Sequence, residues 1–234
     1  MGSMRSLAAR LLALLVIPTV ALAACGATAE PAPAATSALP DATATASPTP
    51  VSVGGTWTVG ATSKATARVR EQLVGVSAPS DAVLVATGAK GSFLLNPDGT
   101  FGADSTISCD LSSLASDQRG RDDFVKRTAL VVQQFPTADL VPLKATGLPL
   151  PLPASGDFTF KLTGKLTIHG ATKDVTFDVA AKRSGSDLTA TATANPSFKF
   201  GDFGMSAPSV PLRVVSVVDE IRLVVELVAT GPAN

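Results

Sequence analysis

Residues 158–182 read FTFKLTGKLTIHGATKDVTFDVAAK, and this stretch decides the fold. Apolar side chains or glycine occupy every second position of its first half, and threonine, lysine or histidine fills the positions between them. Residues 170–173 supply a turn, after which valine and phenylalanine resume the alternation. Because successive side chains of a strand point to opposite faces, the pattern predicts two antiparallel strands with one buried and one solvated face.

The same period of two recurs along most of the chain. It runs through residues 57–69, 188–194 and 221–229, and residues 105–111 form a further predicted strand. We therefore expect a mainly β protein of about eight antiparallel strands, which either stack as a sandwich or close into a barrel.

Two segments depart from this pattern. Residues 120–134 carry apolar side chains at helical spacing behind the acidic pair Asp122 and Asp123, which predicts one amphipathic helix. Residues 148–153 alternate leucine with proline. Because proline cannot donate a ladder hydrogen bond, these residues predict a connection or an edge segment.

Small side chains bear on the choice between a barrel and a sandwich. Two predicted strands carry them on their apolar faces, namely Ala61, Ser63, Ala65 and Ala67 in one and Ala190, Ala192 and Ala194 in the other. A closed barrel of about eight strands is just wide enough to be filled or to hold one ligand, and small inward residues leave room. The same alanines also suit close packing under the helix or in a sandwich, so composition alone leaves both arrangements open.

Composition and charge exclude several classes of function. The chain has 234 residues with 19 basic and 19 acidic side chains, whereas nucleic-acid binders carry a basic excess. One histidine and two cysteines are too few for a zinc finger or a histidine-rich metal site. His169 alternates outward beside a turn, and the sequence has no nucleophile elbow of the form Gly-x-Ser-x-Gly. We therefore expect no nucleic-acid partner, no metal, no cofactor and no catalytic residue.

The N-terminus is predicted to be a lipoprotein export signal. Arg5 and Arg10 precede an apolar run over residues 11–24, which is shorter than the roughly 20 residues that a bilayer span needs. The run leads into LAAC over residues 22–25, which resembles the bacterial lipobox, in which the cysteine is acylated and becomes the first residue. We therefore expect residues 1–24 to be removed, Cys25 to be lipidated, and the protein to be membrane-anchored outside the cytoplasm.

Residues 25–53 are predicted to be a tether. Alanine, threonine, proline and serine dominate them, so the segment cannot bury a core. A flexible coil of this length spans roughly 30 Å on average and roughly 90 Å when fully extended. The folded domain then covers residues 54–234, in which Cys109 has no disulfide partner and is expected to be a buried thiol.

Several motifs occur in order along this domain. They are Trp57 with Ser63, Arg121-Asp122, Phe135-Pro136, LTGKLTIHGATKDV over residues 162–175, FGDFGM over residues 200–205 and VDEI over residues 218–221. In this combination the domain resembles the YceI-like family of exported, lipocalin-like, polyisoprenoid-binding proteins. Residues 67–93 carry little of the family pattern, and Lys64 stands where the family usually has another polar residue.

The resemblance implies a lipocalin-like antiparallel β-barrel that takes up a long isoprenoid tail, with the head of the amphiphile near the mouth. We expect non-catalytic binding, storage or transport of a polyisoprenoid or quinone-type lipid by a membrane-tethered barrel. The residues expected to line the cavity are Trp57, Val59, Ala65, Ala67, Phe160, Leu162, Leu166, Ile168, Phe177, Val179, Ala190, Ala192, Phe203, Met205, Leu223 and Val225. An enzyme acting on a bound lipid and a cell-surface structural or interaction protein with a filled barrel are the alternatives, and the sequence leaves a homodimer open.

Overall fold

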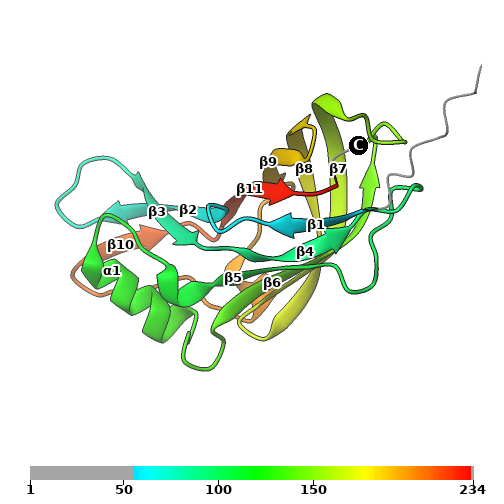
Figure 1. The fold of residues 1–234 in the computed structure, drawn as a ribbon. Helices are drawn as coiled ribbons and strands as arrows, with labels where there is room; N and C mark the ends of the chain where they lie inside the picture. Colours follow the sequence, from blue (N-terminus) through cyan, green and yellow to red (C-terminus); the bar gives the residue numbers. More distant parts are fainter. Residues whose placement is uncertain (1–54, 233–234) are drawn as a thin grey trace, which may run out of the picture. The chain divides into compact units, whose positions relative to one another are not determined.

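The computed structural model describes residues 55–232, so the predicted signal peptide, Cys25 and the tether lie outside the described residues. The elements, in chain order, are β1 (Thr56–Val59), β2 (Lys64–Leu73), β3 (Ser80–Thr87), β4 (Lys90–Leu94), β5 (Thr106–Asp110), η1 (Leu111–Ser113), α1 (Arg119–Phe124), η2 (Val125–Ala129), β6 (Thr137–Thr146), β7 (Ser155–Ile168), β8 (Ala171–Ser184), β9 (Asp187–Ala194), η3 (Phe200–Phe203), β10 (Val214–Val217) and β11 (Arg222–Thr230) (Figure 1). Within residues 55–232, no helix has both the length and the apolar character needed to cross a bilayer.

Eight strands close into an antiparallel barrel. They follow the order β1, β4, β5, β6, β7, β8, β9 and β11, and β1 pairs with β11 to complete the ring. Residues 158–182 form most of β7 and β8, which pair along their whole length from Ser155 opposite Ser184 to Ile168 opposite Ala171. The predicted barrel of about eight strands is therefore confirmed.

β1 and β2 are two parts of the strand predicted over residues 57–69. The prediction of one uninterrupted strand is wrong, because residues 60–63 leave the ladder and Ala61 is exposed rather than turned inward. Both parts nevertheless pair with the same strand, with Val59 opposite Ala229 and Lys64 opposite Glu226. The barrel wall therefore continues across the break.

Beyond the ring, β2 and β3 continue as a long hairpin. β10 pairs with the last part of β2, where Val214 lies opposite Leu73 and Val217 opposite Glu71. Figure 1 shows α1 and β10 together at the end of the barrel from which this hairpin projects, whereas β1 begins and β11 ends at the opposite end. The helix and the hairpin thus extend one end of the barrel only.

The helical segment is shorter than predicted. The predicted helix over residues 120–134 is wrong at its C-terminal end, because α1 passes into the π-helical turn η2 and the helical run stops at Ala129. The reason is local: Val131 has a φ of 47°, a left-handed conformation that a right-handed helix cannot contain. Leu130, at the end of the run, packs against the barrel core.

The buried apolar side chains form three clusters. The largest includes Phe177 and Phe203, the second surrounds the stacked rings of Trp57 and Phe93, and the third lies around Leu84 next to α1 and η2. At the Trp57 end, the two ends of the domain meet, since Gly55 lies against the ring of Pro232. These clusters and the strand ladders all lie within residues 55–232, so this segment has its own core and folds as a unit.

Candidate functional site

The barrel encloses a large cavity at the end that carries α1 and β10. Its volume is about 660 Å³, and side chains from β2, β3, β5, β6, β7, β8 and β11 form its walls. Exposed residues that line it, among them Gln118, Arg127 and Arg213, mark where it opens, and we call this opening the mouth. A site of this volume is in the range of about 300–1,000 Å³ that small-molecule pockets occupy.

A second cavity lies deeper in the barrel. It measures about 90 Å³, and every side chain that lines it is apolar. Trp57 and Phe93 lie along it, from the cluster that closes the end of the barrel opposite the mouth. The two cavities share four lining residues, which are Ile107, Leu140, Phe177 and Val225.

The predicted cavity residues lie along these two spaces with one exception. The large cavity is lined by Ala65, Ala67, Leu166, Ile168, Phe203, Met205 and Leu223, the small one by Trp57, Phe160, Leu162, Val179, Ala190 and Ala192, and both by Phe177 and Val225. Val59 lines neither of the two and packs in the cluster around Trp57 instead. Contact of any of these residues with a ligand stays a prediction.

That β3 lines the cavity was not predicted from the sequence. Ala82, Leu84 and Ala86 face the large cavity, and Ala89 follows them. Their signal was available, because Ala82, Leu84 and Ala86 occupy every second position of an apolar strand. With Ala65 and Ala67 of the neighbouring strand, they line one side of the cavity mostly with small side chains. The small size of these side chains leaves the space open.

An ion pair crosses the mouth end of the large cavity. Arg121 of α1 binds Glu71 of β2, with Nη2 at 2.5 Å from Oε1, and the two side chains are only 13% and 8% exposed. Arg121 also binds Asp117 at 2.5 Å. The pair therefore fastens α1 to β2 and adds two charged groups to the polar side chains at the mouth.

Arg183 occupies the other end of the barrel. It is 1% exposed, and its guanidinium donates to the carbonyl oxygens of Gly185 at 2.8 Å and Pro232 at 3.1 Å, and to those of Leu152 and Pro153. It also lies 5.1 Å from the centre of the Trp57 ring, within cation–π range. Burial lowers the pKa of this arginine below its usual value.

Glu71 and Arg183 are ionisable residues on inward strand faces, where the alternation of the sequence predicts apolar side chains. Glu71 follows Val69 on the inward face of β2, and Arg183 follows Ala181 on the inward face of β8. Each comes directly after a run of apolar residues on the inward face of its strand. Both are tolerated inside because each has hydrogen-bond partners.

The motif over residues 200–205 forms part of the large cavity. Asp202 accepts hydrogen bonds from the Lys173 side chain and from the Lys199 N–H at 2.8 Å, and these hold the pKa of its carboxyl below the usual value. This cap fixes η3, which directs Phe203 and Met205 into the cavity wall. His169, half-buried, has Nδ1 at 3.3 Å from the Phe203 carbonyl oxygen.

Other titratable groups serve the fold. Cys109 is buried, as expected, and burial raises the pKa of its thiol. Asp219 accepts from the Phe200 N–H at 2.9 Å, and Glu220 accepts from the Ser197 hydroxyl at 2.8 Å. Among residues 55–232, no group of three or more histidine, cysteine, aspartate or glutamate side chains is placed to hold a metal ion.

Comparison with known sequences gives one family and two relatives. A profile described as the YceI-like domain matches residues 56–229. Two UPF0312 proteins, from two strains of Pseudomonas putida, are each 33% identical over 128 residues. That match covers 47% of this chain and 61% of each relative, so the chain spans about three-fifths of the length of the curated relatives it matches.

Two solved structures share the fold. A polyisoprenoid-binding domain from Saccharophagus degradans, implicated in plant cell wall breakdown, aligns with a TM-score of 0.58 at 13% identity and covers 75% of this chain and 98% of that domain. BcnA from Burkholderia cenocepacia aligns with a TM-score of 0.52 at 21% identity and covers 72% of this chain and 96% of BcnA. Both likenesses concern the fold of the barrel.

Proposed function

We propose that this chain, which belongs to the YceI-like domain family, binds, stores or transports a polyisoprenoid or a similar long-chain amphiphile, such as a quinone-type lipid. The observation that carries the proposal is the cavity of about 660 Å³, which has apolar walls and polar groups gathered at its mouth. The structural neighbour from Saccharophagus degradans is itself a polyisoprenoid-binding domain, which supports a lipid ligand.

The cavity walls favour hydrocarbon over a polar metabolite. Alanine, leucine, phenylalanine and valine side chains dominate them, and burial of each methylene group from water contributes roughly 0.8 kcal/mol. Transfer from a bilayer is nearly neutral by comparison, because lipid tails are as apolar as the cavity. We therefore propose a carrier that exchanges its lipid with a membrane rather than one that holds it irreversibly.

The polar groups suggest how such a lipid is oriented. Glu71, Gln118 and Arg121 line the mouth end of the large cavity, whereas the deep cavity is lined by apolar side chains only. A head group can form hydrogen bonds at the mouth without losing its contact with water, and a tail cannot. The head therefore stays at α1, and the tail points toward Trp57.

Exposed apolar side chains next to the mouth support direct exchange with a bilayer. Val74, Leu212 and Val215 are 54%, 92% and 65% exposed. They are the chain neighbours of Leu73, Arg213 and Val214, which line the large cavity. We call these three residues the apolar rim. An apolar rim of this kind can enter the membrane interface, so that a lipid passes into the barrel without crossing water.

We also propose that lipidation of Cys25 and the tether over residues 25–53 hold the domain at a membrane outside the cytoplasm. The described domain begins at Gly55, at the end opposite the mouth. Residues 56–73 run from there to the hairpin over at most about 60 Å, at about 3.3 Å per residue. A tether that reaches roughly 90 Å when extended is long enough for the mouth to touch the same membrane.

Binding accounts for the cavity better than the two alternatives. A filled barrel with a purely structural role does not fit a cavity of about 660 Å³. An enzyme acting on a bound lipid needs a free acid or base at the mouth, whereas Arg121 and Glu71 are bound to each other. We therefore propose no catalytic step.

Mass spectrometry of the folded domain tests the proposal. Residues 54–234 are purified without detergent, and the bound material is measured by native mass spectrometry and after extraction into organic solvent. We expect a prenyl lipid in stoichiometric amount. If no lipid is found, and delipidated protein takes up neither farnesol nor ubiquinone from phosphatidylcholine vesicles, the proposal is wrong.

A pair of matched variants makes the test specific for the cavity. Ala67→Phe places a ring inside the large cavity, whereas Ala180→Phe places the same ring on the exposed face of β8. The first should lose the lipid and the second should retain it. Equal lipid content in the two variants would show that the lipid binds elsewhere.

A further inference from the structure

We infer that Phe177 sets the length of tail that this protein accepts, because its ring closes the barrel between the large cavity and the deep one. The inference rests on the proposed lipid-binding function and adds a selectivity to it. Its starting observation is that Ile107, Leu140, Phe177 and Val225 line both cavities. Residues that line two spaces lie between them, so these four side chains form a partition.

The partition is drawn from four separate strands. Ile107 belongs to β5, Leu140 to β6, Phe177 to β8 and Val225 to β11. Ile107 and Leu140 are direct partners across the β5–β6 ladder, so two members of the partition are fixed side by side. The partition therefore draws its side chains from several positions around the barrel wall.

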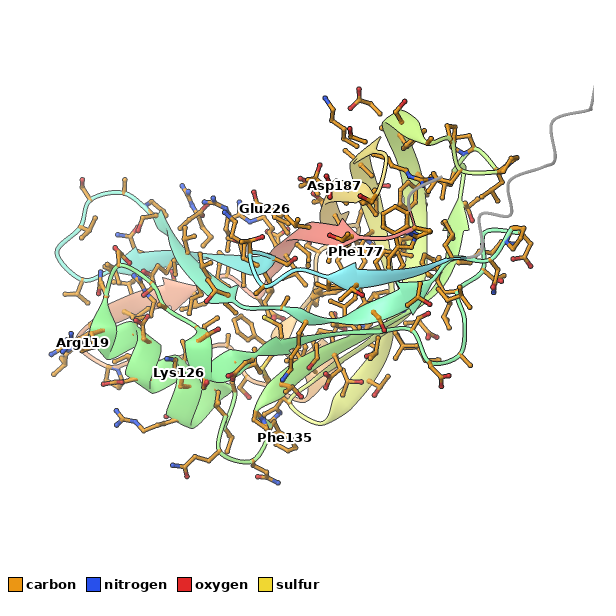
Figure 2. All side chains as sticks on the ribbon, viewed as in Figure 1. Arg119, Lys126, Phe135, Phe177, Asp187 and Glu226 are labelled. Atoms are coloured by element: carbon orange, nitrogen blue, oxygen red, sulfur yellow. The ribbon has the colours of Figure 1, made fainter. Side chains whose placement is uncertain are left out.

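Phe177 is the largest and most deeply buried member of the partition, at 0% exposure. Figure 2 shows it well away from Arg119 of α1 and Lys126 of η2. Its partner on β9 is Ala194, which is small and leaves room for a ring at this level. Removal of this ring is thus the single change that joins the two cavities.

The deep cavity is suited to the end of a hydrocarbon chain. All of its lining side chains are apolar, so water in it would have no side-chain hydrogen-bond partners. In the wild-type barrel, however, a tail that enters from the mouth meets Phe177 first. The accepted length is therefore the length that the large cavity holds, and the deep cavity of about 90 Å³ stays beyond its reach.

Trp57 provides a reporter for the deep cavity. It is the single tryptophan of the chain, and it lines the deep cavity but not the large one. The probe is geranylgeraniol with bromine on its terminal isoprene unit, since bromine quenches tryptophan fluorescence at contact distance. We expect the wild-type domain to bind this probe with little quenching of Trp57, and Phe177→Ala to bind it with strong quenching.

Chain-length preference gives a second, independent readout. Across prenyl alcohols of increasing length, the affinity of the wild type should stop rising at the length that fills the large cavity. In Phe177→Ala, the alcohol that is one isoprene unit longer than this limit should bind more tightly by on the order of tenfold or more, since the added unit is buried in the deep cavity. Ala190→Leu, which narrows the deep cavity, should cancel this gain when combined with Phe177→Ala.

Two further variants control for damage to the core. Phe203→Ala removes a ring that is equally buried but lines the large cavity alone, so it should leave Trp57 unquenched. Phe177→Leu is the milder variant that should show an intermediate effect if Phe177→Ala does not fold.

The outcomes separate this inference from the proposed function. Strong quenching of Trp57 in the wild type, or an unchanged length preference in the folded Phe177 variant, overturns the partition while leaving lipid binding intact. If neither the wild type nor the variants bind any prenyl alcohol, the proposed function is overturned and the partition with it.

Discussion

The hydroxyl of Ser63 takes the place of a backbone group opposite Val228. Its Oγ accepts a hydrogen bond from the Val228 N–H at 2.9 Å and donates one to the Val228 carbonyl at 3.1 Å. The same carbonyl accepts from the Gly60 N–H at 2.7 Å. One buried side chain therefore bridges the break between β1 and β2, at which the barrel would otherwise have unpaired backbone groups.

Ser63→Ala should weaken the closure of the barrel. It removes both bonds and leaves the partly buried Val228 N–H without its partner, which we expect to lower the free energy of unfolding by about 1–3 kcal/mol. Urea unfolding measures the loss, and hydrogen exchange should show faster exchange at the Val228 amide. Ser112→Ala, at an exposed position, is the control and should change stability by less than about 0.5 kcal/mol. Equal effects of the two substitutions would show that the bridge contributes nothing.

Arg183→Met should destabilise the end of the barrel opposite the mouth. The substitution keeps much of the apolar volume but leaves four carbonyl oxygens without the guanidinium, so we expect a loss of roughly 3 kcal/mol in unfolding free energy. The emission of Trp57, which is 1% exposed, should shift to longer wavelength as its environment opens. Lys182→Met, one residue earlier on the outer face of β8, is the matched control. A red shift in the control alone, or in neither protein, would contradict this role.

The Glu71–Arg121 pair should show a large coupling energy. Glu71→Leu or Arg121→Met alone leaves one charge in a mostly buried place, whereas the double variant leaves none. We expect a coupling of on the order of 2 kcal/mol in a double-mutant cycle. The exposed pair Lys165–Asp174 provides the comparison and should give about 1 kcal/mol or less. Similar values for both pairs would mean that burial does not strengthen the contact.

The hydrogen bonds that Asp202 accepts from the Lys173 side chain and the Lys199 N–H should stabilise the fold at neutral pH but not in acid. Its folded-state pKa is held below the usual 3.8, first by the Lys173 side chain and then by the Lys199 N–H. The charged carboxylate therefore stabilises the fold above about pH 4, and this contribution is lost as the pH falls through the folded-state value. Asp202→Asn should be less stable than the wild type at about pH 7, and the gap should narrow by about pH 3. Urea unfolding at both pH values measures it.

Lys173→Met is the companion variant for this prediction. It removes the largest cause of the lowered pKa while leaving the carboxylate in place, so it too should narrow the gap at low pH. A difference from the wild type that stays constant with pH in both variants would contradict the assignment.

The sequence contains most of the barrel, because a period of two records which face of each strand is buried. β7 and β8 could be predicted almost residue by residue for this reason. Extending the period past Val69 and past Ala181 would also have placed Glu71 and Arg183 inside. These two polar positions were therefore predictable from the alternation itself.

Other features depend on contacts that the pattern does not record. Residues 60–63 continue the alternation although they leave the ladder, and only the bonds of Ser63 to the distant Val228 reveal the break. The end of the helical run depends on the backbone of Val131, not on a helix-breaking residue. The inferred division of the interior arises only when the barrel closes and brings side chains from separate strands, such as Phe177 and Val225, to line both cavities.

The contact between Gly55 and Pro232 has a consequence for engineering this domain. Because the two ends are neighbours, a short peptide can join them, and the chain can be reopened at the turn of residues 74–79 without cutting a ladder. Such a circular permutant keeps the same barrel with its termini moved beside the entrance. Fusion partners attached at Gly55 or Pro232, by contrast, lie at the end of the barrel opposite the mouth and leave the mouth accessible.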